Sequence, residues 1–462
     1  MTMSLKQSDL FRFERLVSKL CKPSDNPTIA FLPHGGKLRL CAFAPSATLS
    51  MLVPRDDFAD AFAMRWSDFK TVAAAKKGTD VTFELQKGAV RVRADEVLHH
   101  FLTSKKLDTP PHCPSQTATH SKTRLFDALT NAARCVDQNS VRNALTGICL
   151  RGATKQIVST SGIQLLVQNG FDISTWGKTD VVCPVSKIFG SKELKEIDTD
   201  EVLIGLVAEH VYFSVGDVEI WLRTIKGNSF PKIDGLLEPV AGATFLTVHP
   251  TDVQFILDRI DKLPGAKNHE APLYVSLNKK VQIRAHDCDK KTAIALELTH
   301  STFTGEPLSF AMNRLFLKNA LQLGCWRIGI DPTGDKPVIC TGDDKTHVFV
   351  SLAGSEPEAE HTDIITTSMQ SAVQSAVTPP KATVPATAPA PVKRRRRVAS
   401  KRDTVPQPSC KLVLLQSAEA IRTDLRNSLV QVNALIREVK SQRQKDRLLQ
   451  TTMDSLRKLS LA

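Results

Sequence analysis

The densest cluster of reactive side chains in the chain is His286, Asp287, Cys288 and Asp289. Imidazole, thiolate and carboxylate groups are ligands that can together hold a transition metal. The cluster lies between two runs typical of strands, VQIRAH and AIALELTH, at a point where the chain must reverse its direction. We therefore expect a hairpin turn at these residues and no metal ion.

A second group of such residues, His112, Cys113 and His120, lies in the polar stretch 105–120, where Pro111 and Pro114 favour irregular chain. The ten cysteines include no C-x-x-C pair, which argues against a zinc ribbon or a dithiol redox site. The P-loop, G-x-S-x-G and H-E-x-x-H motifs do not occur. The sequence therefore predicts no catalytic residues, no metal and no cofactor, and so a protein that is not an enzyme.

The net charge of +13 is unevenly distributed along the chain. Residues 355–462 hold 18 Lys and Arg against 10 Asp and Glu, a net charge of +8, which leaves +5 for residues 1–354. A basic excess favours a polyanionic partner such as nucleic acid, although charge of this size also simply solvates a surface. The N-terminus has no apolar core of signal-peptide length, and no apolar run reaches 18 residues. We expect a cytoplasmic protein without a membrane partner.

The elements that must position any site follow a pattern that recurs three times. Apolar residues at helical spacing occur at residues 8–20, 125–136 and 251–263, and each of these stretches is followed by runs typical of strands. Shorter helices are predicted at 66–77, 184–194 and 313–323. The strands after them begin with Val81, Val202 and Ile328, at steps of 121 and 126 residues. A period of this length predicts three α+β domains at 1–115, 116–243 and 244–354. Three unrelated domains remain the alternative.

Several motifs in this pattern carry a resemblance to a known family. NALTGICL (143–150), STSGIQLL (159–166), RTIKGNSFPKIDGLL (223–237) and THVFVSL (346–352) resemble motifs of bacterial DNA polymerase III beta subunits, the sliding clamps. The chain resembles a divergent member, because Ile163-Gln164 replaces the family's usual basic step and the last strand lacks its Pro-Met ending. Residues beyond about 354 form a C-terminal extension without a counterpart.

The resemblance implies an architecture and a role. Two copies would join head to tail in a ring, with helices lining the hole and antiparallel sheets outside. Such a ring encircles duplex DNA as the processivity factor of a replicative polymerase, an accessory subunit without chemistry of its own. A few basic residues facing the hole suffice to attract phosphates. The candidates on the expected pore helices and loops are Lys70, Lys76, Lys77, Lys122, Arg134, Arg142, Lys187, Lys192, Arg259 and Lys318. A solvated helix face is the alternative for each.

The resemblance also implies a groove between the second and third domains. It would take short motifs from DNA polymerase, clamp loader and other clamp-binding proteins, and such a groove needs apolar walls. By motif position its walls are Leu145, Thr160, Gly162, Leu165, Pro231, Leu236, Val348, Val350 and Leu352. Simple strand core is the alternative for Leu145, Leu165, Val348 and Val350.

The extension is expected to have two parts. Residues 355–408 are Pro/Ala-rich and basic, typical of a disordered linker, and include the DNA-contact candidates Lys393, Arg394, Arg395, Arg396 and Arg397. Residues 409–462 keep a 3–4 apolar spacing that predicts a coiled-coil or docking helix. Two functions follow: a replicative clamp located with the nucleoid, or a clamp-like paralogue that acts as a non-replicative scaffold or regulatory DNA-associated protein through this tail.

Overall fold

The computed structural model describes residues 2–367, apart from 23, 55–59, 104–106, 174–175, 178, 227–229, 239–241, 267–270 and 288. The predicted C-terminal helix at 409–462 and the basic run Lys393–Arg397 lie outside the described residues. Among the helices that are described, none has the length and apolar content that a membrane crossing requires.

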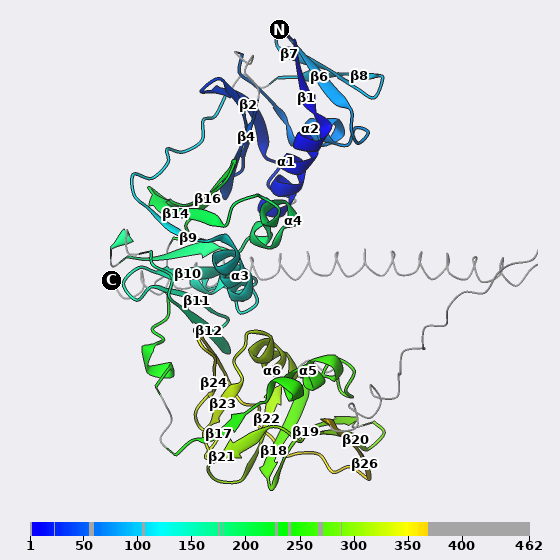
Figure 1. Ribbon diagram of the computed structural model, residues 1–462, viewed down its shortest axis with the longest axis vertical. Coiled ribbons are helices and arrows are strands. Elements are labelled where there is room, and N and C mark those ends of the chain that lie inside the picture. The colour runs from blue at the N-terminus through cyan, green and yellow to red at the C-terminus, as the bar shows by residue number, and fades with distance from the viewer. Residues whose placement is uncertain are drawn as a thin grey trace, which may run out of the picture. The chain divides into compact units, whose positions relative to one another are not determined.

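The first domain alternates strands with two helices that lie together against its sheets (Figure 1). Its elements are β1 (Thr2–Lys6), α1 (Gln7–Leu20), β2 (Thr28–His34), β3 (Lys37–Phe43), β4 (Ala47–Val53), β5 (Phe62–Arg65), α2 (Trp66–Ala73), β6 (Asp80–Gln86), β7 (Ala89–Ala94) and β8 (Val97–Leu102).

The second domain repeats this order, with a short helical pair in place of α2. Its elements are β9 (Thr117–Ser121), α3 (Lys122–Ala133), η1 (Asn143–Thr146), β10 (Gly147–Arg151), β11 (Gln156–Thr160), β12 (Gln164–Asn169), β13 (Asp180–Pro184), η3 (Lys187–Gly190), α4 (Lys192–Lys195), β14 (Glu201–Val207), β15 (His210–Val215) and β16 (Val218–Arg223). The segment that follows carries the 3-10 turn η4 (Asp234–Leu236).

The third domain repeats the order again and adds two strands, β21 and β26. Its elements are β17 (Thr244–Thr247), α5 (Pro250–Arg259), β18 (Pro272–Asn278), β19 (Lys280–Asp287), β20 (Thr292–Leu298), β21 (Thr302–Thr304), β22 (Leu308–Asn313), α6 (Arg314–Gln322), β23 (Arg327–Ile330), β24 (Val338–Thr341), β25 (Lys345–Phe349) and β26 (His361–Thr366).

The strand order within the sheets shows the threefold repeat most directly. One half of each domain has the order β5-β2-β3-β4, β13-β10-β11-β12 or β22-β18-β19-β20, and the other half has β8-β7-β6-β1, β16-β15-β14-β9 or β25-β24-β23-β17. The halves join across domains, because β4 pairs with β16 and β12 pairs with β25, both antiparallel. The domain limits that we expected, 115 and 243, fall between β8 and β9 and between β16 and β17.

The helices form where the apolar spacing predicts them, and each buries one face. In α1 the buried residues include Leu10, Phe13, Val17 and Leu20, and the Phe13 ring meets Phe69 of α2 edge to face at 5.6 Å. Such a stripe stabilises a helix mainly through tertiary packing. The cores of the first two domains share one large apolar cluster, and the core of the third domain forms another, which Cys135 and Leu166 of the second domain join.

Two of the predicted short helices differ from the structure. The helix expected over 66–77 ends at Ala73, and the Lys76 N–H donates a hydrogen bond to the carboxylate of Asp95 instead of to the helix. The helix expected over 184–194 is split, because the Ser186 hydroxyl caps η3 and the Ser191 hydroxyl starts a new helical segment, α4, by accepting from Leu194 N–H. Side-chain hydrogen bonds therefore override the apolar spacing at both places.

The prediction of a disordered linker over residues 355–408 is wrong for its first residues. Residues 361–366 form β26, which pairs in parallel with β20 at the edge of the third domain's sheet. The preceding acidic residues hold this segment on the domain, since Glu356 lies 3.1 Å from Arg284 and Glu360 lies 2.8 Å from Lys291. The linker prediction rested on the composition of residues 355–408 as a whole, whereas the acidic residues at its start form ion pairs.

Candidate functional site

The joint between the second and third domains carries the groove of greatest interest. Here β12 pairs antiparallel with β25, and Leu165 stands opposite Val348. Both side chains are only 3% exposed, so they form an apolar floor. A cavity of about 390 Å³ opens above this floor, between the joint and the segment that carries η4.

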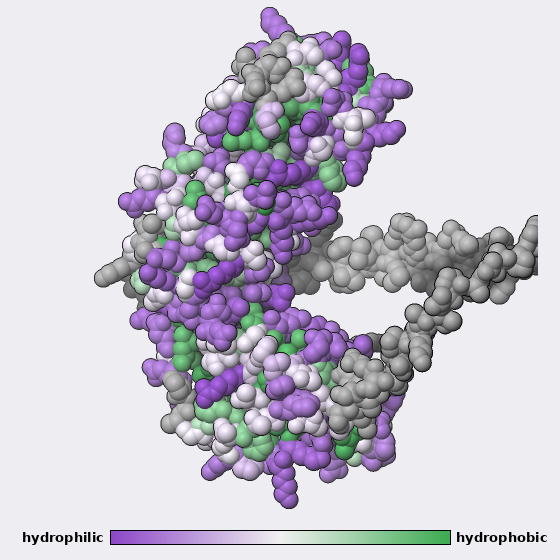
Figure 2. All heavy atoms as spheres, in the orientation of Figure 1, coloured by the Kyte–Doolittle hydropathy of each residue, from purple (hydrophilic) through white to green (hydrophobic). Residues whose placement is uncertain are grey.

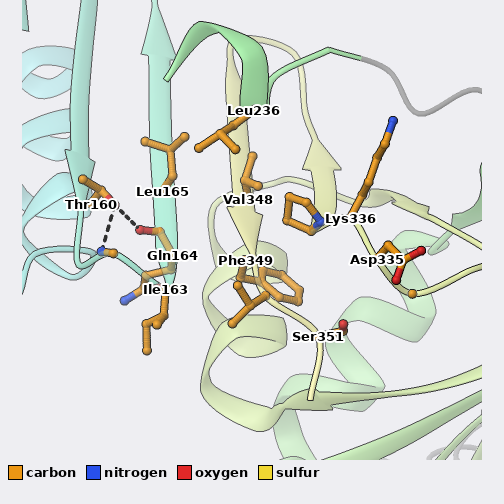
Figure 3. Close-up of a pocket in the computed structure, with 14 residues that line it drawn as sticks. Thr160, Ile163, Gln164, Leu165, Leu236, Asp335, Lys336, Val348, Phe349 and Ser351 are labelled. Atoms are coloured by element: carbon orange, nitrogen blue, oxygen red, sulfur yellow. Dashed lines mark hydrogen bonds between the residues drawn. The ribbon is translucent and has the colours of Figure 1, made fainter. Parts of the chain in front are cut away.

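The walls of this groove are apolar side chains that remain partly open to solvent. Figure 3 shows Leu236 over the gap between Leu165 and Val348. Leu236 is 46% exposed, Val350 44% and Ile163 55%, which is unusual for large apolar residues that share one hollow. Burying such side chains against a partner is favourable, so the groove is suited to an apolar anchor residue.

One rim of the groove is a tight turn fixed by a single hydroxyl. The Thr160 hydroxyl donates to the Gln164 carbonyl at 2.7 Å and accepts from the Gly162 N–H at 3.1 Å (Figure 3). Gly162 has φ +93°, a left-handed conformation that residues with a side chain rarely adopt. The opposite rim is the turn 334–337, where Asp335 and Lys336 are exposed. The groove thus has a rigid apolar centre and a polar edge.

Six of the nine predicted groove residues line this cavity, namely Thr160, Gly162, Leu165, Leu236, Val348 and Val350. The other three do not. Leu145 is 8% exposed and belongs to the interior beside the turn, Pro231 is exposed before η4, and Leu352 donates its N–H to Ala311 of β22. These three residues belong to segments that were predicted to form the groove. Which residues of a segment line the cavity depends on the folded backbone.

The sequence prediction missed eight of the 14 lining residues. Ile163, Gln164, Phe349 and Ser351 are neighbours of predicted residues, and Gly334 to Pro337 form the turn between β23 and β24. The sequence around these last four residues, T-G-D-K-P, predicts only a turn. Nothing in it indicates that the turn would meet the second domain.

A buried histidine ties the two strands of the joint together. His347 is fully buried, and its Nε2 lies 3.3 Å from Gln164 Oε1 across the joint. Desolvation lowers the pKa of His347 to about 4, because a charged imidazole would lose its hydration there. His347 is therefore neutral near pH 7 and belongs to the support of the groove.

The predicted DNA-contact residues outside the tail fall on the helices and on the loops beside them. Lys70, Lys76, Lys77, Arg134, Arg142, Lys187 and Lys192 are exposed, and Arg259 and Lys318 are partly exposed. Lys122 is the exception. It is 7% exposed, and its ammonium donates to the carbonyls of Lys195 and Ile197 at 3.1 and 2.6 Å. Lys122 thus joins α3 to the end of α4, and we withdraw it as a DNA-contact candidate.

Several of these cations have acidic or polar neighbours. Lys192 lies 3.3 Å from Glu196, and Lys318 lies 2.5 Å from Asp261. Arg134 donates to Gln322 of α6 at 3.0 Å. The arginines of α1 are paired as well, since Arg12 and Arg15 lie 2.6 and 3.4 Å from Asp217 and Glu193.

Exposed pairs of this kind contribute little to stability and are readily exchanged for other charges. Figure 2 shows mostly hydrophilic residues on the surface that α3 and α4 form.

The two clusters of possible metal ligands, at 286–289 and at 112–120, include residues that lie in strands or form hydrogen bonds with their neighbours. β19 and β20 form the expected hairpin, the His286 ring lies 2.8 Å from Glu356, and Asp287 accepts from the Lys290 N–H. Cys288 lies outside the described residues. His120 was expected in irregular chain but belongs to β9, which pairs with β14. Within the described part of the chain, no three His, Cys, Asp or Glu residues come together as metal ligands would.

Comparison with known proteins places the fold. No family model and no curated protein matches the sequence. Among solved structures, the DNA polymerase III subunit beta of Pseudomonas aeruginosa is similar over 77% of this chain and 100% of its own, with a TM-score of 0.64 at 16% identity. The beta sliding clamp of C. crescentus has a TM-score of 0.66 at 13% identity, and the beta subunit of Thermotoga maritima 0.62 at 14%, with the same coverage. The described body of this chain has the sliding-clamp fold.

Proposed function

We propose that this chain is a divergent member of the DNA polymerase III beta subunit family and works as a DNA sliding clamp. It would encircle duplex DNA as a head-to-tail ring of two copies and tether a replicative polymerase to its template. The observation that carries the proposal is the β12·β25 joint with its apolar groove, in a chain whose strand order repeats three times.

The groove supports the recruiting half of the proposal. Its rigid apolar centre and polar edge are suited to a short linear motif with one or two apolar anchors, the kind of segment by which polymerase, clamp loader and other partners would attach. Most of the binding energy would come from the anchors, with backbone groups at the Thr160 turn fixing their register.

The helix surfaces support the enclosing half of the proposal. A clamp must hold DNA without gripping one position, and weakly cationic helix faces meet this need because each phosphate contact is easily exchanged. The residues we propose for these contacts are Lys70, Lys76, Lys77, Arg134, Arg142, Lys187, Lys192, Arg259 and Lys318, all of them exposed or partly exposed.

The test of enclosure compares circular with linear DNA. Protein loaded onto a nicked plasmid by the loader of its polymerase is isolated at a salt concentration that removes loosely bound protein. A restriction enzyme then cuts the plasmid once. Enclosure predicts that the protein is retained on the circle and released on cutting. Equal retention before and after cutting would point to ordinary charge-driven binding.

A second function, a clamp-like scaffold or DNA-associated regulator that works through its tail, is favoured by one observation. The edge of β20, at which the third domain would meet another copy, is covered by β26 of the same chain. Deleting residues 393–402 from the full chain separates the two roles. If the tail carries DNA binding, the deletion lowers DNA affinity and flattens its salt dependence by several units of log–log slope, about one unit for each phosphate that the tail no longer neutralises. If affinity and slope stay unchanged, the basic run is only a solvated linker or serves some partner other than DNA.

A further inference from the structure

Two strand pairings between domains, which we call the internal joints, indicate how the third domain would pair with a second copy of the chain. In the first two domains the third strand of one half-domain, β4 or β12, receives the last strand of the following domain, β16 or β25. Each joint is antiparallel and holds five residue pairs. Among the described residues, two strands of these kinds have no such counterpart, namely β20 as a receiving strand and β8 as a last strand. A second copy would therefore place its β8 on β20.

The receiving edge of β20 is already occupied. Residues 361–366, which we call the cover strand, pair with β20 from Thr292↔His361 to Glu297↔Thr366, beside each other in Figure 1. The pairing is parallel, whereas both internal joints are antiparallel. The cover strand comes after the last repeated strand, β25, so it is an addition to the threefold pattern.

The segment that carries the cover strand is held at both ends. Before it, Glu356 contacts Arg284 and His286 at 3.1 and 2.8 Å. After it, the Thr367 hydroxyl donates to the buried carboxylate of Asp252 at 2.7 Å. Nearly all of these partners belong to the third domain's own sheet and helix, so this part of the C-terminal extension is docked on that domain.

The cover strand itself is lightly buried, which distinguishes it from the strands of the internal joints. Its first four residues are exposed, and Ile364 is 51% exposed. In β25, by contrast, the last three residues are buried. Parallel pairing is also slightly less stable per residue than antiparallel pairing. The cover strand thus pairs with the backbone of β20 without adding much apolar burial, so its removal exposes little apolar surface.

The complementary edge, on β8, has the features of an incomplete joint. β8 is the last strand of its sheet, so one side of its backbone has no strand partner among the described residues. Val97, Leu98 and Leu102 are 51%, 43% and 72% exposed. Natural proteins rarely leave a strand edge with exposed apolar residues unless something pairs with it.

We propose that the cover strand is a removable lock on ring closure: while it pairs with β20, the β8 strand of a second copy cannot, and its release opens that edge. This inference rests on the ring of the proposed function and adds its regulation. The basic run at 393–402 follows the cover strand further along the same C-terminal extension.

The test uses the full chain with Ile364→Pro and Ile365→Pro together. Adjacent residues in a strand point their N–H groups to opposite sides, so the pair removes one donor to β20 whichever residue supplies it. The matched control, Ile364→Val with Ile365→Val, keeps a β-branched strand. Sedimentation over a range of concentrations gives the mass. We expect the wild type and the valine control at 50.8 kDa and the proline variant at twice that mass.

A further change, His99→Pro with His100→Pro in β8, should return the proline variant to the monomer mass. If wild type and proline variant are both dimers that depend on β8, the ring stands and the lock is wrong. If neither dimerises at any concentration, the lock is wrong and the ring of the proposed function is contradicted with it. A dimer that survives the β8 change also overturns the proposal, because the copies then meet at another surface.

Discussion

Lys122 and Lys187 both open a helical segment of the second domain, yet their ammonium groups have different surroundings. Lys122 is buried against two backbone carbonyls, whereas Lys187 is exposed on η3. Both were predicted as DNA contacts, because a sequence gives the residue type and the helix but not which face of the helix is covered. Burial assigns Lys122 to structure and leaves Lys187 as a candidate.

Lys122→Met should lower the free energy of unfolding by about 2 kcal/mol, because it leaves two buried carbonyls without their charged donor. Lys187→Met, the matched control, should leave that free energy within about 0.5 kcal/mol of the wild type. Urea denaturation of both variants measures the difference. A Lys122→Met protein as stable as the control would contradict the structural role.

His347 makes the stability depend on pH. Its pKa is about 4 in the folded protein, below the ordinary value near 6.5, so the unfolded chain binds the proton more readily. The stabilisation is complete above pH 6.5 and is lost as the pH falls toward 4. From pH 6.5 to pH 5 the free energy of unfolding should fall by about 2 kcal/mol through this residue.

Urea denaturation at several pH values measures this effect. His347→Leu should remove that part of the pH dependence, and His112→Leu, at an exposed position, serves as the control. An unchanged pH dependence in His347→Leu would show that other groups cause it.

At the scale of elements, local periodicity predicted most helices and hairpins, because one buried face leaves a clear pattern. It missed β4, whose residues are nearly all buried, since a strand covered on both faces has no alternation. It also missed β1 and β9, which have only five residues each. The groove was predicted in part, since motifs located its segments while Gly334–Pro337 arrives from a turn that only the fold brings there.

The groove prediction is tested with a labelled peptide that carries two adjacent apolar side chains, by fluorescence polarisation. Leu236→Ser removes a wall and should weaken binding about tenfold, a loss of about 1.4 kcal/mol. Val141→Ser is the control, because Val141 is 87% exposed and lies outside the groove lining. Equal loss in both variants, or in neither, would mean that the peptide binds elsewhere.

At the scale of the whole molecule, the described body behaves as three copies of one unit joined by strand pairing. The repeat was visible in the sequence as a period near 120 residues, whereas the cover strand was not, because the composition of residues 355–408 as a whole is typical of a disordered linker. The partner of that segment, the edge of β20, lies more than 60 residues away in the sequence, so no local pattern indicates the pairing.

Enclosure of DNA by the proposed ring can be tested by blocking the ends of linear DNA. Two linear duplexes of one length and sequence carry the same charge, and one has a bulky protein bound at each end. After loading and transfer to high salt, we expect the protein to stay on the blocked duplex and to leave the open one by sliding off its ends. Equal lifetimes on the two duplexes would contradict enclosure, since only a ring can distinguish a blocked end from an open one.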